Sequence, residues 1–66
     1  MTSRNMTLEQ AYNRFHDYVV VMGLQPEAIT ETDQYTIYKI EAGKQTIEMH
    51  FYHDEDRAIE FVQTWD

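Results

Sequence analysis

The spacing of apolar residues changes between Gly23 and Pro26, and this change constrains the fold more than any other feature of the sequence. From Leu8 to Met22, apolar residues recur at the i, i+3, i+4, i+7 spacing of one helix face. Gly23 suits the left-handed residue that ends many helices, and Pro26 prevents continuation. Beyond Pro26, β-branched and aromatic residues alternate with polar ones, as in half-buried strands. The 66-residue chain is therefore predicted to fold as one small α+β domain.

The first helix is predicted over residues 7–22. Thr7 and Gln10 have the spacing of a capping box, which places the helix start at Thr7. Residues 1–6 are mostly polar, and we expect them to form a disordered N-terminal end. The single α+β domain is then expected to span residues 7–66.

Residues 34–41 and 44–53 are predicted to form a β-hairpin, and residues 27–32 a weaker edge strand. Alternation with polar residues assigns three apolar side chains of the second hairpin strand to one buried face: Ile47, Met49 and Phe51.

The length of the hairpin loop decides which residues of the first hairpin strand face the core. A two-residue turn at 42–43 would set Ile37 opposite Glu48 and mix the faces, whereas a three-residue loop at 41–43 sets Ile37 opposite Ile47. We therefore predict the three-residue loop. It leaves three apolar or aromatic side chains on the outer face: Tyr38, Ile40 and Tyr52.

A second helix is predicted at the C-terminal end of the sequence. Asp54 is a suitable N-cap, and the acidic residues that follow it suit a first helical turn. The helical spacing then recurs at four positions: Ala58, Phe61, Val62 and Trp65. The predicted order is α-β-β-β-α, with two helices packed on one face of an antiparallel meander.

This order resembles the topology of double-stranded-RNA-binding domains. In that family a lysine-rich start of the last helix contacts phosphate groups, whereas this sequence has Asp54-Glu55-Asp56-Arg57 at that place. Carboxylates repel phosphates, so the resemblance implies a shared fold and not RNA binding.

The negative charge of the chain is concentrated in residues 27–66. Residues 1–26 are balanced, whereas residues 27–66 carry the entire formal charge of −7. Such a surface favours basic protein surfaces or cations as partners, and disfavours bare nucleic acid and anionic membranes. We therefore predict partner-binding residues among the carboxylates and the outward tyrosines: Glu27, Glu31, Asp33, Tyr38, Glu41, Glu48, Tyr52, Asp54, Glu55, Asp56 and Glu60.

The favoured function is a non-enzymatic protein-binding module that occupies the basic nucleic-acid-binding surface of another protein. Carboxylates two residues apart on a strand lie roughly 6.6–6.8 Å apart, so rows of them can stand in for phosphates. In size, charge and lack of cysteine, the chain resembles phage-encoded antagonists of host nucleases, such as anti-CRISPR and anti-restriction proteins, which implies an inhibitor. Catalysis is disfavoured because the chain has no Cys, no Gly-rich phosphate loop and only Ser3 as a serine. No cofactor is predicted.

Two alternatives stay open. A domain of this size buries only about 60% of its unfolded surface, so a homodimer through the outward tyrosines or through Val20 and Val21 would stabilise it. His50 and His53 lie near carboxylates and are of a type that binds metals, but they match no recognised motif, and we assign no metal site. The lack of cysteine and of an apolar N-terminal segment favours a cytoplasmic location.

Overall fold

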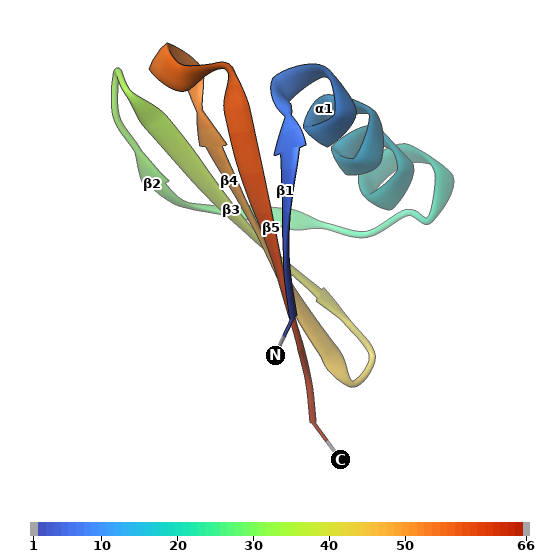
Figure 1. Cartoon of the computed structure of the whole chain (residues 1–66). Helices are drawn as coiled ribbons and strands as arrows, with labels where there is room; N and C mark the ends of the chain where they lie inside the picture. Colours follow the sequence, from blue (N-terminus) through green and yellow to red (C-terminus); the bar gives the residue numbers. More distant parts are fainter. Residues whose placement is uncertain (1, 66) are drawn as a thin grey trace.

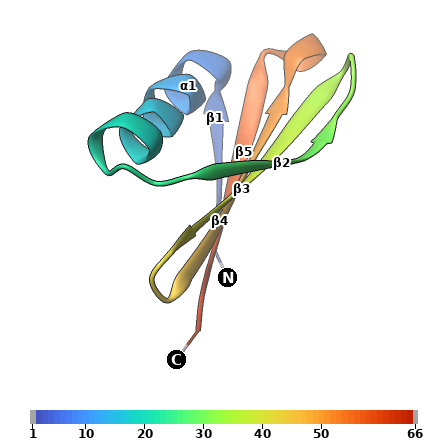
Figure 2. The same cartoon turned by 180° about the vertical axis from the view of Figure 1, so that it is seen from behind.

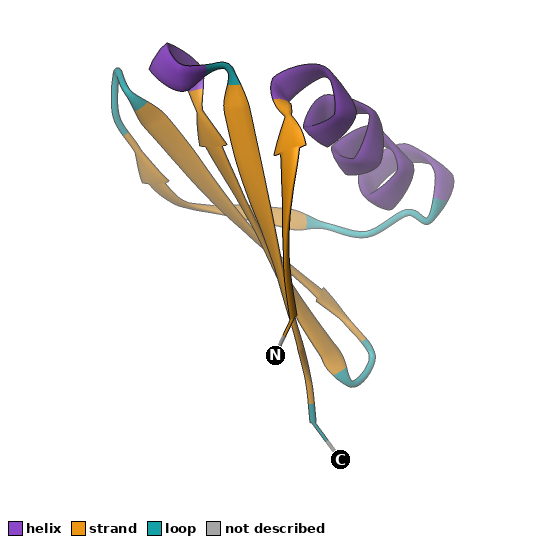
Figure 3. Cartoon of the chain, in the orientation of Figure 1, coloured by secondary structure: helices purple, strands orange, loops and turns teal. Residues whose placement is uncertain are grey.

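In the computed structural model, which describes residues 2–65, five antiparallel strands form one sheet in the order β1-β5-β4-β3-β2. One α-helix crosses one face of this sheet (Figure 1, Figure 3). The elements follow one another as β1 (Thr2–Thr7), α1 (Leu8–His16), a π-helical turn (Asp17–Val21), β2 (Pro26–Glu31), β3 (Tyr35–Ala42), β4 (Gln45–Tyr52), a 3₁₀ turn (His53–Glu55) and β5 (Arg57–Thr64). The α+β class is confirmed, but the predicted α-β-β-β-α order with two helices is wrong.

The predicted first helix is confirmed, together with the signals at both of its ends. The side chain of Thr7 accepts a hydrogen bond from the backbone N–H of Gln10, and the side chain of Gln10 accepts one from the backbone N–H of Thr7, both at 3.1 Å. α1 continues directly into the π-helical turn, and Gly23 follows with a φ of +70°. The N–H of Leu24 then donates to the carbonyl of Tyr18 at 2.9 Å, which closes the helix end.

Residues 2–6, predicted to be disordered, belong to strand β1. β1 pairs with β5 from Thr2 opposite Val62 to Thr7 opposite Arg57, with no shift in register. The polar composition of these residues gives no local indication of a strand. They form one because they pair with residues more than fifty positions away. Met6 is its buried residue, 9% exposed.

The predicted C-terminal helix is a strand, and this is the largest difference from the prediction. β5 lies between β1 and β4, so hydrogen-bonded neighbours flank it on both sides. A short apolar run fits a helix and a strand about equally well, and here the two sheet partners decide. Asp56, with a φ of +49°, ends the 3₁₀ turn and redirects the chain into β5. The topology of double-stranded-RNA-binding domains is therefore not the topology of this chain.

The β3–β4 hairpin is confirmed, but its predicted three-residue loop is wrong. Ala42 pairs with Gln45 across a two-residue turn, whose first residue, Gly43, has a φ of +61°. Ile40 consequently lies opposite Ile47 and is fully buried. The faces of β3 are reversed relative to the prediction: Tyr38 and Ile40 face α1, and Tyr35 and Ile37 face away from it. The predicted edge strand at residues 27–32 is present as β2.

The core lies between α1 and the sheet. From the end of the helical segment the chain crosses to β2 at the opposite edge of the sheet, as the view from behind shows (Figure 2). No helix among residues 2–65 is long and apolar enough to span a membrane. The buried apolar side chains are Met6, Ala11, Tyr18, Ile40, Ile47, Met49, Phe51 and Ala58.

Candidate functional site

The sheet face opposite α1 carries a continuous group of half-buried side chains. Strand register arranges them in three rows across β3, β4 and β5. We call these nine residues the open face, and in row order they are Tyr35, Tyr52 and Arg57, then Ile37, His50 and Ile59, then Lys39, Glu48 and Phe61.

The aromatic side chains of the open face contact one another. The His50 and Phe61 rings meet edge to face with centroids 4.7 Å apart, and Tyr35 and Tyr52 lie at 6.3 Å. The Arg57 guanidinium lies over the Tyr52 ring, 4.6 Å from its centroid. Cation–π and aromatic contacts of this kind hold large side chains in place before any partner arrives.

Each cation of the open face lies beside carboxylates. Lys39 is placed by register between Glu27 on β2 and Glu48 on β4, and its Nζ lies 3.6 Å from an oxygen of Glu41. Arg57 Nε lies 3.0 Å from an oxygen of Glu55. With a carboxylate beside each of them, neither cation presents an uncompensated charge, and the rim of the face is acidic.

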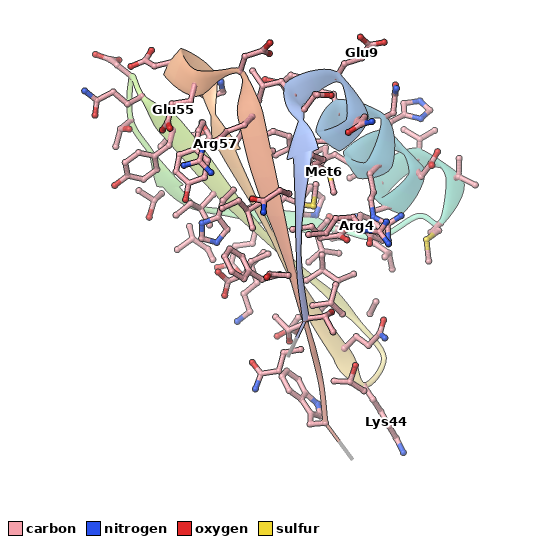
Figure 4. All side chains as sticks on the ribbon, in the orientation of Figure 1. Arg4, Met6, Glu9, Lys44, Glu55 and Arg57 are labelled. Carbon is pink, nitrogen blue, oxygen red and sulfur yellow. The ribbon has the colours of Figure 1, made fainter. Side chains whose placement is uncertain are left out.

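Figure 4 separates the two sides of the sheet. Arg57 and Glu55 lie on the side away from α1, and Met6 and Arg4 lie on the α1 side. A cleft of about 390 Å³ adjoins the rim of the open face, and its charged lining residues are Glu27, Lys39 and Glu41.

Five of the predicted partner-binding carboxylates gather at one end of the sheet. The turn between β2 and β3 lies against the 3₁₀ turn, because the N–H of His53 donates to the carbonyl of Gln34 at 2.9 Å. His53 Nε2 and Thr36 Oγ1 are 2.9 Å apart, which joins the same two segments. We call this region the acidic end, and its exposed carboxylates are Glu31, Asp33, Asp54, Glu55 and Asp56.

Two predicted site residues, Tyr38 and Glu60, lie on the α1 side of the sheet. The expectation that Tyr38 faces outward is wrong, and Glu60, predicted as a partner-binding carboxylate, is buried. Tyr38 packs on Phe15 with ring centroids 4.8 Å apart. Glu60 is 3% exposed, and its Oε2 accepts hydrogen bonds from Arg14 Nε and from the Tyr18 hydroxyl, each at 2.6 Å.

In this buried cluster, the contacts of Glu60 with Arg14 and Tyr18 shift the pKa values of both partners. Burial and the hydrogen bond to Glu60 raise the pKa of Tyr18 to about 12. The hydrogen bond to Glu60 also raises the pKa of Arg14. Both shifts come from contacts that hold α1 and its π-helical turn against β5, so we assign the cluster to folding and not to the partner-binding site.

The remaining predicted residues, Glu27, Glu41, Glu48 and Tyr52, lie on the open face or its rim. Sequence reasoning missed four apolar or aromatic members of the face: Tyr35, Ile37, Ile59 and Phe61. For Ile59 and Phe61 the signal was the alternation of residues 57–62 as a strand, and for Tyr35 and Ile37 it was the two-residue turn that reverses the faces of β3.

The two histidines considered as metal ligands lie in separate surroundings. His50 Nε2 is 3.0 Å from Glu48 Oε1 on the open face, whereas His53 contacts Thr36 at the acidic end. Among residues 2–65, no group of three His, Asp or Glu side chains is placed to hold a metal ion.

No protein-family model matches the chain, and no match was found among curated proteins or among solved structures.

Proposed function

We propose that this chain is a non-enzymatic protein-binding module whose open face and acidic end dock on a basic surface of another protein. One observation carries the proposal: aromatic and aliphatic side chains lie side by side on a sheet face that no element among residues 2–65 covers. Contiguous patches that combine Tyr and Arg with apolar side chains and have charges at the rim are typical of protein interfaces.

The charge of the chain supports a basic partner. The formal net charge is −7, and five exposed carboxylates of the acidic end adjoin the open face. Complementary charge speeds association and excludes wrong partners, while the desolvated aromatic centre supplies the affinity. The surfaces that nucleic-acid-binding proteins present to phosphates carry the complementary positive charge. The proposed role is therefore to compete with nucleic acid for such a surface.

The test compares two pairs of charge-neutralising substitutions. Asp33→Asn with Asp54→Asn changes the acidic end, and Glu9→Gln with Asp17→Asn removes the same charge from exposed positions of the helical segment. A partner is first captured from nuclease-treated extract of the native host, and its Kd is then measured by calorimetry. We expect the first pair to weaken binding about tenfold and the second by less than about twofold.

The open face is tested separately with Tyr52→Ala. We expect at least about tenfold weaker binding from this variant, because truncating a central aromatic residue of an interface is costly. In fluorescence anisotropy, the wild-type chain should displace nucleic acid from the captured partner, and binding should weaken with salt. The proposal is wrong if the partner binds nucleic acid equally well in the presence of the chain, or if both charge pairs weaken binding equally.

A further inference from the structure

The two edges of the sheet differ in how they are protected against pairing with another strand. β2 begins with Pro26, which has no backbone N–H, and a bulge between Ala28 and Thr30 interrupts its register. It also carries Glu27 and Glu31. Proline, bulges and charges are the usual devices that stop a sheet edge from pairing further.

β1, at the other edge, has neither a proline nor a bulge. Its six residues pair with β5 without a register shift, and Arg4 is its one charged residue. In an antiparallel ladder, every second residue of an edge strand directs its N–H and C=O away from the sheet. β1 therefore presents a regular, uninterrupted row of backbone donors and acceptors along the edge seen in Figure 1.

We propose that β1 pairs antiparallel with β1 of a second copy of this chain, joining two five-stranded sheets into one of ten strands. The distribution of charge favours a second copy of the chain, paired at β1, as the partner. Residues 1–26 are balanced, so two copies of a chain with net charge −7 approach at the β1 edge with little repulsion. Pairing at β2 would instead bring the glutamates of both copies together. A two-fold dimer is also the commonest way to enlarge a small fold.

The alternation of side chains and the charge of Arg4 together select the register. If both helices lie on the same side of the joined sheet, residues that face each other across the seam must have the same orientation, so one residue lies on the two-fold axis. With Arg4 on the axis, two guanidinium groups would be directly opposed, which is destabilising. With Asn5 on the axis, Arg4 lies opposite Met6 of the second copy, and no like charges meet. The Asn5 register is the one we infer.

This dimer goes beyond the proposed partner binding and does not depend on it. α1 follows β1 directly, so antiparallel pairing sets the two helices at opposite ends of the seam. The two open faces then lie on the same side of one continuous sheet.

Sedimentation of matched variants tests the dimer. Ser3→Lys with Asn5→Lys adds two positive charges to the β1 edge, and Gln25→Lys with Thr30→Lys adds the same charge at the β2 edge. We expect the wild type and the β2 variant to be dimeric at about 100 µM and to dissociate on dilution. The β1 variant should dimerise at least about tenfold more weakly, because like charges meet across the seam. Far-UV circular dichroism checks that both variants keep the fold.

Hydrogen exchange gives a second, independent readout. In the wild type, alternate amides of β1 should exchange more slowly at high than at low protein concentration, whereas those of β2 should not change. A monomer at about 100 µM would overturn the proposal. A dimer that persists in the β1 variant would also overturn it. If Tyr52→Ala then abolished that dimer, the open face would be the contact between the two copies.

Discussion

Glu60 carries a carboxylate that is buried between the helical segment and β5. Its carboxylate is 3% exposed, and both of its side-chain hydrogen bonds, from Arg14 and Tyr18, converge on one oxygen. A buried charge without partners is strongly destabilising, so these two bonds fix how the helical segment sits on β5. The π-helical turn contributes directly, because Tyr18 is its buried residue.

The protonation of Tyr18 makes stability depend on alkaline pH. Its pKa is raised from about 10 to about 12, so the folded chain keeps this proton in a range where the unfolded chain loses it. The stabilisation is complete below pH 10 and is lost as the pH rises to about 12, up to roughly 2–3 kcal/mol. Tyr18→Phe should be less stable by about 1.5–3 kcal/mol at neutral pH, and should lose less stability on alkalinisation. Urea unfolding of both proteins at about pH 9 and about pH 11.5 measures this; equal losses would contradict it.

Among the elements, the two-residue β3–β4 turn sets the faces of the sheet. Gly43 has a φ of +61°, and a Cβ built there meets nothing within 4 Å, so backbone strain is the only cost of a side chain. Gly43→Ala should therefore cost about 1–2 kcal/mol, and Gly43→Asn less, because Asn tolerates the left-handed region. Urea unfolding gives the difference, with Gln45→Ala as a control at an exposed strand position. If Gly43→Ala and Gln45→Ala were equally stable, a strained turn at Gly43 would be ruled out.

The elements that the sequence predicts correctly are those with local signals. The helix has its capping box, apolar stripe and terminal glycine within residues 7–23, so short-range interactions define it. β1 lacks such signals, because it becomes a strand through β5, fifty or more positions away. β5 pairs with β4 across a short turn, but the acidic residues of that turn and the spacing that follows fit a helix start equally well. The same limit applies to the site: composition indicates its acidic rim, whereas its aromatic centre depends on the register of β3 and on β5 being a strand.

At the scale of the whole molecule, crowding of like charges opposes folding at the acidic end. Neutralising Asp33 and Asp54 together should raise the free energy of unfolding by about 0.5 kcal/mol at low salt, or about 2–4 °C in Tm. The gain should shrink as salt screens the repulsion. Glu9→Gln is the control and should lower Tm, because it removes a favourable charge from the first turn of α1.

Differential scanning calorimetry at two salt concentrations measures these shifts. A salt-independent gain, or none, would show that the acidic end is not under electrostatic strain. Since the same two substitutions are expected to weaken partner binding, a gain in stability with a loss of affinity would indicate that this charge serves binding.

The central place of β5 has a consequence for how the chain is made. During synthesis from the N-terminus, β1 emerges first, but the strand that joins it to the sheet comes after all the others. Until then β2, β3 and β4 can form their meander, while β1 has no strand to pair with. A nascent chain from which β5 has not yet emerged has an unpaired first strand, which proteases and other nascent chains can reach. The fold is therefore complete only once β5 has emerged and joined β1 to β4.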